Sequence, residues 1–482
     1  MKVLQVSAEI YPLLKTGGLA DIAGALPAAL TAAGCDLRLL LPGFAPILEN
    51  LQGASVCGQR VTPWGETVTL RQGRLAALDM QAYVIDAPGL YARPGGPYED
   101  VHRQPFADNH RRFALLGWMA GELAQGMDAN WQPEVVHSHD WHAGLAPAYL
   151  AFPRVRQPRP VASLHTVHNL AYQGVFSQHC FADLGLPQSA FSVDGVEYYG
   201  QVSFMKAGLY YANRITTVSP SYAKEIQTPE QGCGLDGLLR ARGSVLTGIL
   251  NGVDEAVWNP ATDTLIHSTY GASDRAGKNQ CKAALQAELG LAVHARAPVF
   301  AVVSRLTEQK GLQLVLSAID EMIARGGQLV VLGSGDSGLE NALAERARRQ
   351  PQSVAAFLGY DEALAHRIFA GSDVTLVPSR FEPCGLTQMY GLKYGSLPLV
   401  HRVGGLADTV VDCVPENLAA QSANGITFDD FSAEAFADAM RRALALYESR
   451  ADWDAVTARG MQQSLGWQNS AAQYVALYRQ IA

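Results

Sequence analysis

The sequence lacks the patterns that mark membrane proteins and nucleic-acid-binding proteins. It has no stretch of about 18 uninterrupted apolar residues, so no segment is expected to span a membrane. It has no run of about five basic residues and its formal net charge is −8, which together argue against nucleic acid or an anionic membrane surface as the main partner. The first residues reach Glu9 without a cleavage-like site, so we expect a β-strand there rather than a signal peptide.

Paired cysteines and internal repeats are also missing. The seven cysteines are scattered and form no Cys-x-x-Cys pair, which is typical of reduced thiols, and we therefore expect a cytoplasmic protein. The sequence contains no low-complexity tract and no solenoid period. What it does have is 482 residues, of which 48% are hydrophobic, enough for roughly two to three domains with cores of their own.

Short β-branched runs alternate with longer helical patterns over almost the whole chain, which predicts an α/β fold with helices covering parallel sheets. The predicted strands are 2–6, 37–41, 81–86, 134–138, 161–166, 214–218, 299–304, 328–333, 373–377 and 396–400. The predicted helices are 21–33, 106–125, 142–151, 201–213, 310–325, 338–349, 385–394 and 432–448. We expect one domain at 1–245, a second at 246–460, and a last helix at 461–482 that could pack back on the first domain.

The pentapeptide Gly-Gly-Leu-Ala-Asp occurs twice, at 17–21 and at 404–408. Each copy follows a predicted strand and loop and opens a predicted helix. Its glycine amides therefore lie at the positive end of a helix, a place suited to phosphate or hydroxyl groups. The presence of one copy in each half indicates two similar domains whose glycine turns face a shared cleft.

Five of the twelve histidines lie where two predicted strands end. In open parallel sheets, ligands bind beyond the carboxyl ends of the strands, so the side chains just past those ends are candidates for a site. The candidates here are Asp140, His142, His168 and Asn169. We expect the histidines that come earlier in the two segments to be hydrogen-bonded supporting groups, and these are His137, His139 and His165.

A His-x-His pair followed closely by Asp and His is also found in metal-dependent hydrolases. Those enzymes place the Asp directly before the last His, whereas Asp140 lies two residues before His142. That spacing would turn the carboxylate away from the face on which the other ligands lie. A metal site is therefore the disfavoured interpretation of this segment.

Three cations fall near the ends of predicted strands, namely Lys15, Arg305 and Lys310. An Arg and a Lys five residues apart, across a strand-to-helix turn, can bind two phosphates from different sides, the Arg as a planar fork and the Lys as a point charge. Such a pair suits a diphosphate leaving group. Glu382 lies in a loop before a helix whose free amides begin near Gly385, so a carboxylate and amide donors share a small space that suits a sugar.

Six motifs, in order, resemble those of the bacterial glycogen synthases and the related plant starch synthases. They are Lys15–Asp21, His139–His142, Thr166–Gly174, Asn251–Asp254, Ser304–Gly311 and Ser379–Gln388. These enzymes are retaining glucosyltransferases, so the resemblance implies the GT-B fold, with two Rossmann-like domains facing a deep interdomain cleft. It also implies transfer of glucose from ADP-glucose to the non-reducing 4-hydroxyl of an α-1,4-glucan such as glycogen, with neither a metal nor another cofactor.

The resemblance assigns roles to the residues that match these motifs. The residues implied at the diphosphate and donor glucose are Lys15, Gly17, Gly18, Arg305 and Lys310. Glu382 is implied to face the donor glucose, with His168 near the anomeric centre. The glucose hydroxyls are implied to be held by the amides of Cys384, Gly385 and Leu386. The remaining residues implied to bind substrate are Glu9, Asp21, Tyr98, Asp140, His142, Asn169, Asn251, Thr387 and Tyr390.

The chain departs from the family pattern at two positions. Tyr390 stands where many retaining relatives carry a second Glu for the nucleotide ribose, and it could stack on adenine instead. Val403 stands where synthases commonly have Thr before the second glycine pair, which affects only fine positioning.

No second carboxylate is placed as an evident nucleophile. This agrees with a front-face mechanism in which the departing phosphate helps to deprotonate the acceptor. Three alternative functions stay open from the sequence: a UDP-glucose-dependent retaining GT-B transferase, a phosphorylase that uses pyridoxal phosphate, and a non-catalytic glucan-binding protein.

Overall fold

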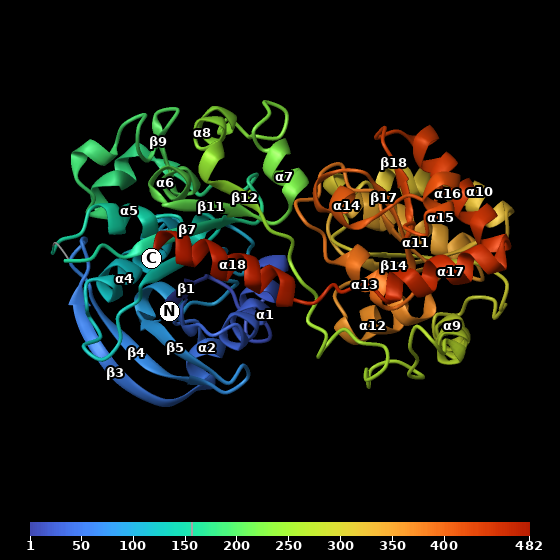
Figure 1. Ribbon diagram of the computed structural model, residues 1–482, viewed down its shortest axis with the longest axis horizontal. Coiled ribbons are helices and arrows are strands. Elements are labelled where there is room, and N and C mark those ends of the chain that lie inside the picture. The colour runs from blue at the N-terminus through green and yellow to red at the C-terminus, as the bar shows by residue number, and fades with distance from the viewer. Residues whose placement is uncertain (156–157) are drawn as a thin grey trace. The chain divides into compact units, whose positions relative to one another are not determined.

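The computed structural model describes residues 1–155 and 158–482, which divide into two compact units. Unit 1 comprises Met1–Gly252 together with Trp467–Ala482, and unit 2 comprises Val253–Gly466. Each unit contains a large sheet of mainly parallel strands flanked by helices (Figure 1), so the predicted α/β class is confirmed. Among the described residues, no helix is both long enough and apolar enough to cross a membrane.

Unit 1 is built on a nine-stranded sheet in the order β12-β11-β7-β6-β1-β2-β5-β4-β3. Its strands are β1 (Lys2–Val6), β2 (Asp36–Pro42), β3 (Leu51–Val61), β4 (Thr67–Leu75), β5 (Met80–Asp86), β6 (Val135–His139), β7 (Ala162–Val167), β11 (Arg214–Thr217) and β12 (Leu246–Gly248). The strands pair in parallel except where β4 pairs with β3 and with β5. A small antiparallel sheet has the order β8-β10-β9 and consists of β8 (Val175–Ser177), β9 (Glu197–Tyr198) and β10 (Gln201–Ser203).

Helices cover both faces of the large sheet of unit 1, and its central strands are accordingly apolar on both sides. The side chains of Val3, Leu4 and Val6 in β1 are wholly buried. The helices are α1 (Gly18–Ala32), α2 (Ala45–Asn50), α3 (Pro88–Tyr91), α4 (Asn109–Ala124), α5 (Ala146–Ala151), α6 (Phe204–Tyr211), α7 (Pro220–Glu225), α8 (Asp236–Ala241) and α18 (Gln468–Ile481). The short 3₁₀ helices are η1 (Trp141–Ala143), η2 (Gln178–Leu184), η3 (Gln188–Ala190) and η4 (Gly243–Val245). The last helix, α18, packs against α1 and β7 (Figure 1), so the end of the chain completes this unit.

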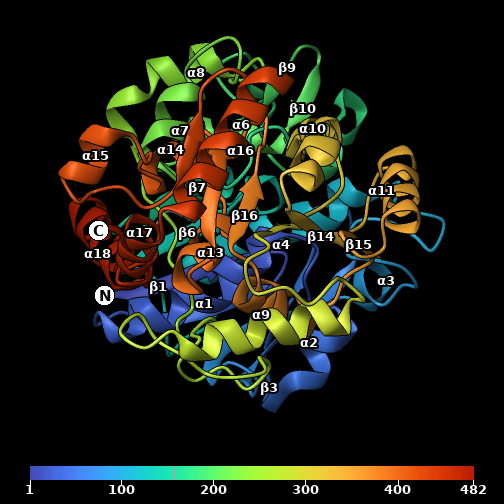
Figure 2. The ribbon, with the colours of Figure 1, turned by 90° about the vertical axis from the view of Figure 1, so that its right-hand side faces the viewer.

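Unit 2 has a six-stranded parallel sheet in the order β15-β14-β13-β16-β17-β18. Its strands are β13 (Val299–Val303), β14 (Gln328–Gly333), β15 (Val354–Leu358), β16 (Val374–Val377), β17 (Leu397–His401) and β18 (Ile426–Phe428). Its helices are α9 (Ala276–Glu288), η5 (Glu308–Lys310), α10 (Leu312–Ala324), α11 (Ser337–Arg349), α12 (Glu362–Gly371), α13 (Thr387–Lys393), α14 (Gly404–Thr409), α15 (Pro415–Ala419), α16 (Ala433–Glu448) and α17 (Arg450–Met461). The pair α9 and α12 lies on one face of the sheet and the pair α10 and α16 on the other (Figure 2).

Several elements were not predicted, among them β15, β18, α9, α12 and α17, and three further differences concern segments of unit 1. Residues 201–203 form β10 rather than the start of a helix, because the Ser203 hydroxyl accepts a hydrogen bond from the Lys206 amide and so caps α6 at its first turn. The helix predicted at 142–151 is split into η1 and α5. The antiparallel strands β3 and β4 were not predicted, because most of β3 is exposed or half-buried and carries few apolar side chains.

Candidate functional site

In unit 1, the first glycine pair is held by a buried carboxylate. Glu9 follows β1, and its Oε2 accepts hydrogen bonds from the backbone amides of Thr16 at 2.5 Å and Gly17 at 3.3 Å. The Tyr98 hydroxyl donates to Oε1 of the same carboxylate. Burial raises the pKa of Glu9, so these donors compensate for a charge that water does not reach. Glu9 therefore fixes the loop that leads into α1.

The glycine pair itself borders open space. A Cβ atom added to Gly17 or Gly18 would meet no heavy atom within 4 Å. The backbone at the start of α1 is therefore accessible to a ligand, as the sequence predicted for a helix end of positive character. The Lys15 ammonium lies in the same turn and forms an ion pair with Asp21, Nζ to Oδ1, at 2.7 Å.

Asp140 combines backbone strain with burial. It follows β6 with φ of 54° and ψ of −176°, a conformation that costs a non-glycine residue about 1–3 kcal/mol. Its Oδ1 accepts hydrogen bonds from the amides of His168 at 2.7 Å and Asn169 at 3.4 Å, which lie at the end of the neighbouring strand β7. Burial raises the pKa of Asp140 to about 7. The carboxylate thus joins the two strand ends that the sequence singled out.

We expect Asp140→Asn to change the pH dependence of stability. In wild type, between about pH 4 and 7, the carboxyl is ionised in the unfolded chain and protonated in the folded one. Stability therefore falls as the pH rises, by roughly 1.4 kcal/mol per pH unit. Asn accepts the same two amide bonds but does not titrate. The measurement is the unfolding temperature of both proteins at several pH values. The unfolding temperature of Asp140→Asn minus that of wild type should increase from pH 5 to pH 8. A difference that does not change with pH would contradict the raised pKa of Asp140.

Four histidines form a buried group behind this strand edge. The rings of His139 and His168 share a hydrogen bond, Nδ1 to Nε2, of 2.9 Å. The ring of His137 lies beside that of His139, tilted by 36°, with the ring centroids 4.1 Å apart. Burial lowers the pKa of His168 to about 3, with a smaller effect from His165. His168 is therefore a neutral imidazole that can donate or accept a hydrogen bond but carries no charge at neutral pH.

The last helix reaches this histidine group. Tyr478 of α18 forms a hydrogen bond of 2.7 Å with Nδ1 of His137, whose Nε2 forms one of 2.6 Å with the Thr166 hydroxyl. On the other side of the edge, His142 stacks on Tyr98 with ring centroids 4.7 Å apart. These contacts fix the rings around His168 from both sides.

Several buried polar atoms at the candidate residues have no hydrogen-bond partner within the described chain. They are Nδ1 of His142, Nδ1 of His168 and Oδ1 of Asn251. Buried polar atoms are nearly always paired, so each of these atoms can form a hydrogen bond with a bound ligand or with water. Within the described ranges, no group of three His, Cys, Asp or Glu side chains is placed to hold a metal ion.

In unit 2, the carboxylate and the cation predicted from the sequence are in contact. Oε2 of Glu382 accepts hydrogen bonds from Nζ of Lys310 at 2.5 Å and from the Ser379 hydroxyl at 2.9 Å. Lys310 follows β13 and Glu382 follows β16, which are neighbours in the sheet. The η5 turn that carries Lys310 packs so closely on Pro378 that a Cβ at Gly311, where φ is 72°, would lie 1.9 Å from the Pro378 carbonyl oxygen. Arg305 lies exposed before this turn.

The second glycine pair packs against the Glu382 loop. The Gly405 amide donates to the carbonyl of Glu382 at 3.1 Å, and a Cβ at Gly405 would lie 2.2 Å from the carbonyl oxygen of Cys384. Gly385 has a φ of 73°, which turns the backbone before α13 into a left-handed conformation. Each unit therefore carries one copy of the pentapeptide beside its candidate residues.

Two residues that the sequence analysis did not single out support or extend this half of the site. The Gln388 amide donates to the carbonyls of Cys384 at 3.0 Å and Gly385 at 2.9 Å, and so fixes the loop after Glu382. Tyr360 follows β15 and is 71% exposed at the same carboxyl edge, where it offers a flat aromatic surface. Tyr390, expected to stack on adenine, lies face to face with Trp258 at 4.0 Å, which covers one side of its ring.

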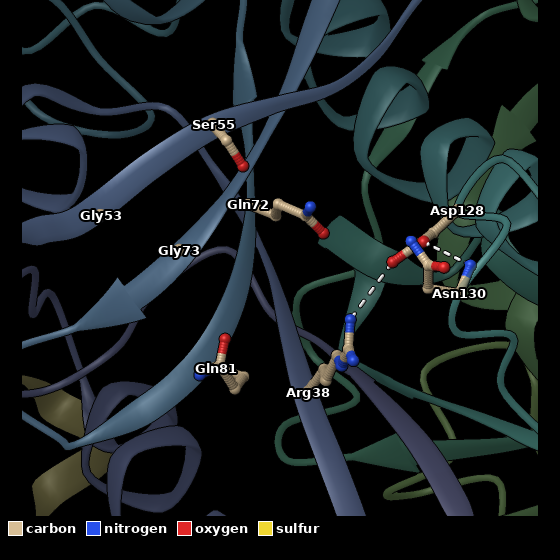
Figure 3. A pocket seen from close by; sticks show the side chains of 8 residues that line it. All are labelled: Arg38, Gly53, Ser55, Gln72, Gly73, Gln81, Asp128 and Asn130. Carbon is tan, nitrogen blue, oxygen red and sulfur yellow. Dashed lines mark hydrogen bonds and ion pairs between the residues drawn. The ribbon is translucent and has the colours of Figure 1, made fainter.

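A polar cavity of about 310 Å³ lies elsewhere in unit 1. Figure 3 shows its lining, in which Arg38 forms an ion pair with Asp128 at 3.2 Å. Arg38 and Gln81 stand near the amino ends of β2 and β5, which places the cavity at the edge of the sheet opposite the candidate residues. It is therefore not part of the candidate site.

Known protein families match residues in both units. The starch synthase catalytic domain family matches residues 2–241, and the glycosyl transferases group 1 family matches residues 291–459. The glycogen synthase of Variovorax paradoxus (strain S110) is 61% identical over 100% of this chain and 99% of its own length. That of Leptothrix cholodnii (strain ATCC 51168 / LMG 8142 / SP-6) is 58% identical over 100% of both chains.

Solved structures agree with these matches. The catalytic domain of starch synthase IV from Arabidopsis thaliana, bound to ADP and acarbose, superposes with a TM-score of 0.89, at 30% identity over 99% of each chain. The sucrose-phosphate synthase of Thermosynechococcus elongatus has a TM-score of 0.59 at 18% identity over 99% of this chain and 98% of its own, a likeness of fold alone.

Proposed function

This chain belongs to the glycogen synthase family of glycosyltransferases, and we propose that it transfers glucose from ADP-glucose to the non-reducing end of an α-1,4-glucan, with retention of configuration and release of ADP. The family membership and the glycosyltransferase activity predicted from the six motifs are thereby confirmed. The nature of the donor is the part that we propose. It is supported by the structural likeness to an enzyme solved with ADP bound.

The observation that carries the proposal is the contact of Glu382 with Lys310 and Ser379. It places a cation and a carboxylate together at the carboxyl edge of a parallel sheet, where nucleotide-sugars bind in folds of this class. Lys310 and Arg305 would neutralise the negative charge that grows on the leaving diphosphate. Tyr360, exposed at the same edge, offers a flat surface for the base.

The candidate residues of unit 1 also suit contact with the donor substrate. We assign Lys15 and the open backbone at Gly17 and Gly18 to the diphosphate and donor glucose. His168 is neutral and has Nδ1 unpaired, so it can hydrogen-bond the donor sugar without adding positive charge beside the anomeric carbon. Glu382, which carries negative charge, opposes the positive charge that develops there.

We propose the following bond changes. The bond between the anomeric carbon and the diphosphate oxygen breaks, and the 4-hydroxyl oxygen of the glucan forms the new bond on the same face of the sugar. The proton of that hydroxyl passes to an oxygen of the departing diphosphate. Retention in this route needs no carboxylate nucleophile on the opposite face of the ring.

The test is glucose incorporation into glycogen from ADP-glucose and, in parallel, from UDP-glucose, each with and without a chelator. We expect transfer from ADP-glucose that survives chelation and far less from UDP-glucose. Preference for UDP-glucose would overturn the proposed donor. Loss of transfer with chelator would overturn the metal-free route, and absence of transfer from both donors would favour a glucan-binding protein without catalysis.

A further inference from the structure

The segment of unit 1 that contains the small sheet carries several exposed apolar side chains. Of the fourteen large hydrophobic side chains that are exposed in the described chain, four lie between residues 172 and 199. They are Tyr172, Val175, Val193 and Tyr199. Single exposed side chains of this kind are normal on a protein surface, so a binding role needs a further feature such as backbone strain. We call this group the hairpin surface.

Tyr199 is the most unusual member of the hairpin surface. It forms, with Gly200, the two-residue turn between β9 and β10, whose flanking residues Tyr198 and Gln201 pair directly. Both turn residues have positive φ, 48° for Tyr199 and 78° for Gly200. Asn or Gly is the residue preferred at the first of these positions, because a bulky side chain is strained there. Tyr199 is also 77% exposed, so burial does not compensate for the strain.

The hairpin is firmly attached to the body of the unit. The Tyr198 hydroxyl donates to the carbonyl of Cys233 at 2.7 Å. The buried Lys206 ammonium donates to the carbonyls of Val193, at 2.7 Å, and Glu197. These bonds hold the segment before the turn in place, so Tyr199 is presented on a rigid support and a ligand would bind it at little cost in ordering.

Hydrogen bonds connect the β9–β10 hairpin to the loop that carries candidate residues. The Gln173 amide donates to the carbonyl of Cys233 at 2.8 Å, the same oxygen that accepts the Tyr198 hydroxyl. Gln173 and Tyr172 belong to the loop that leaves β7 through His168 and Asn169. A chain of direct contacts therefore leads from the end of β7 to the β9–β10 turn, all within unit 1.

We propose that Tyr199 forms a binding subsite for the acceptor glucan, at glucose units away from the end that reacts. The inference rests on the proposed function, because it takes an α-glucan as the acceptor. Such a polymer extends far beyond one glucose, and the C–H face of each glucose ring is apolar. An exposed, rigid aromatic ring packs against that face, as it does against other flat apolar surfaces. The strain at Tyr199 is then explained by its function.

The decisive variant is Tyr199→Asn, because Asn is well suited to the turn and removes only the ring. We expect the variant to unfold at the same temperature as wild type or a higher one. We expect its affinity for glycogen, measured by retardation in a glycogen-containing gel, to fall roughly three- to tenfold. The ratio of kcat/KM with glycogen to kcat/KM with maltotriose should fall by a similar factor, since a short acceptor does not reach the hairpin surface.

Tyr199→Phe is the matched control, because it keeps the ring and should keep wild-type affinity for glycogen. Unchanged glycogen affinity in Tyr199→Asn would overturn the inference. So would an equal loss for glycogen and maltotriose, which would indicate a change in the reacting site instead. If wild type binds glycogen but transfers no glucose, the proposed function fails, and the gel measurement still decides whether Tyr199 binds glucan.

Discussion

Glu382→Gln is expected to lower kcat for glucose transfer by roughly 10²–10³-fold, the usual cost of removing one electrostatic group from a transition state. The Glu382 carboxylate accepts hydrogen bonds from Lys310 and Ser379, and both donors come from the edge where the donor is proposed to bind. Glutamine has the same shape and can still accept these bonds, but it carries no charge. Steady-state kinetics with ADP-glucose should therefore show a loss mainly in kcat rather than in KM.

The matched control for this prediction is Glu308→Gln. Glu308 lies in η5, two residues before Lys310, but its side chain is 81% exposed and pairs only loosely with Arg380 at 3.4 Å. An exposed pair of this kind contributes little to stability, so the control should behave as wild type in both folding and turnover. Near wild-type turnover in Glu382→Gln, with the control unchanged, would remove Glu382 from the proposed mechanism.

Lys15→Ala is expected to produce the second large loss, roughly 10²-fold in kcat. Lys15 lies beside the open backbone of Gly17 and Gly18, and its ion pair with Asp21, at 2.7 Å, is partly solvent-exposed. Loss of such a pair costs about 1 kcal/mol or less, so the variant should fold. The measurement is kcat and KM for ADP-glucose together with the unfolding midpoint.

Lys224→Ala serves as the control, because Lys224 is an exposed lysine on α7 of the same unit. If Lys15→Ala unfolds at the wild-type temperature and also keeps wild-type kcat, Lys15 does not act on the leaving diphosphate. Because Lys15 belongs to unit 1 and Glu382 to unit 2, a large loss in both variants would mean that turnover requires both units.

The strands that carry the candidate residues could be predicted because parallel strands buried on both faces are continuous apolar runs. The segments that became β13 and β16 are largely apolar. Those that became β6 and β7 begin with apolar residues and are buried throughout, although they also contain His, Ser and Thr, and polar residues follow each of the four strands. The antiparallel strand β3 gave no such signal, because its side chains are mostly exposed and no apolar alternation marks it. The burial of a strand, rather than its intrinsic β-propensity, therefore decided whether it could be predicted from the sequence.

The contacts within the candidate site could not be predicted in the same way. Glu9 and Thr16 are seven residues apart, and Lys310 and Glu382 are 72 apart, so only the fold brings these pairs together. Gln388 stands within a motif, but nothing in its residue type indicates that it fixes the Glu382 loop. Roles that depend on three-dimensional proximity, such as that of Tyr478 beside His137, have no local sequence signal at all.

The position of α18 has a consequence for biosynthesis. Unit 1 is made of residues 1–252 and 467–482, so the ribosome must produce all 214 residues of unit 2 (253–466) before the last helix of unit 1 exists. Until then the surface of α1 and β7 that α18 covers is exposed on the nascent chain, and the His137 ring lacks its tyrosine partner. Unit 2 is contiguous in sequence, whereas unit 1 is completed only when α18 has been made, so we expect the face of unit 1 that α18 covers to be prone to aggregation during translation.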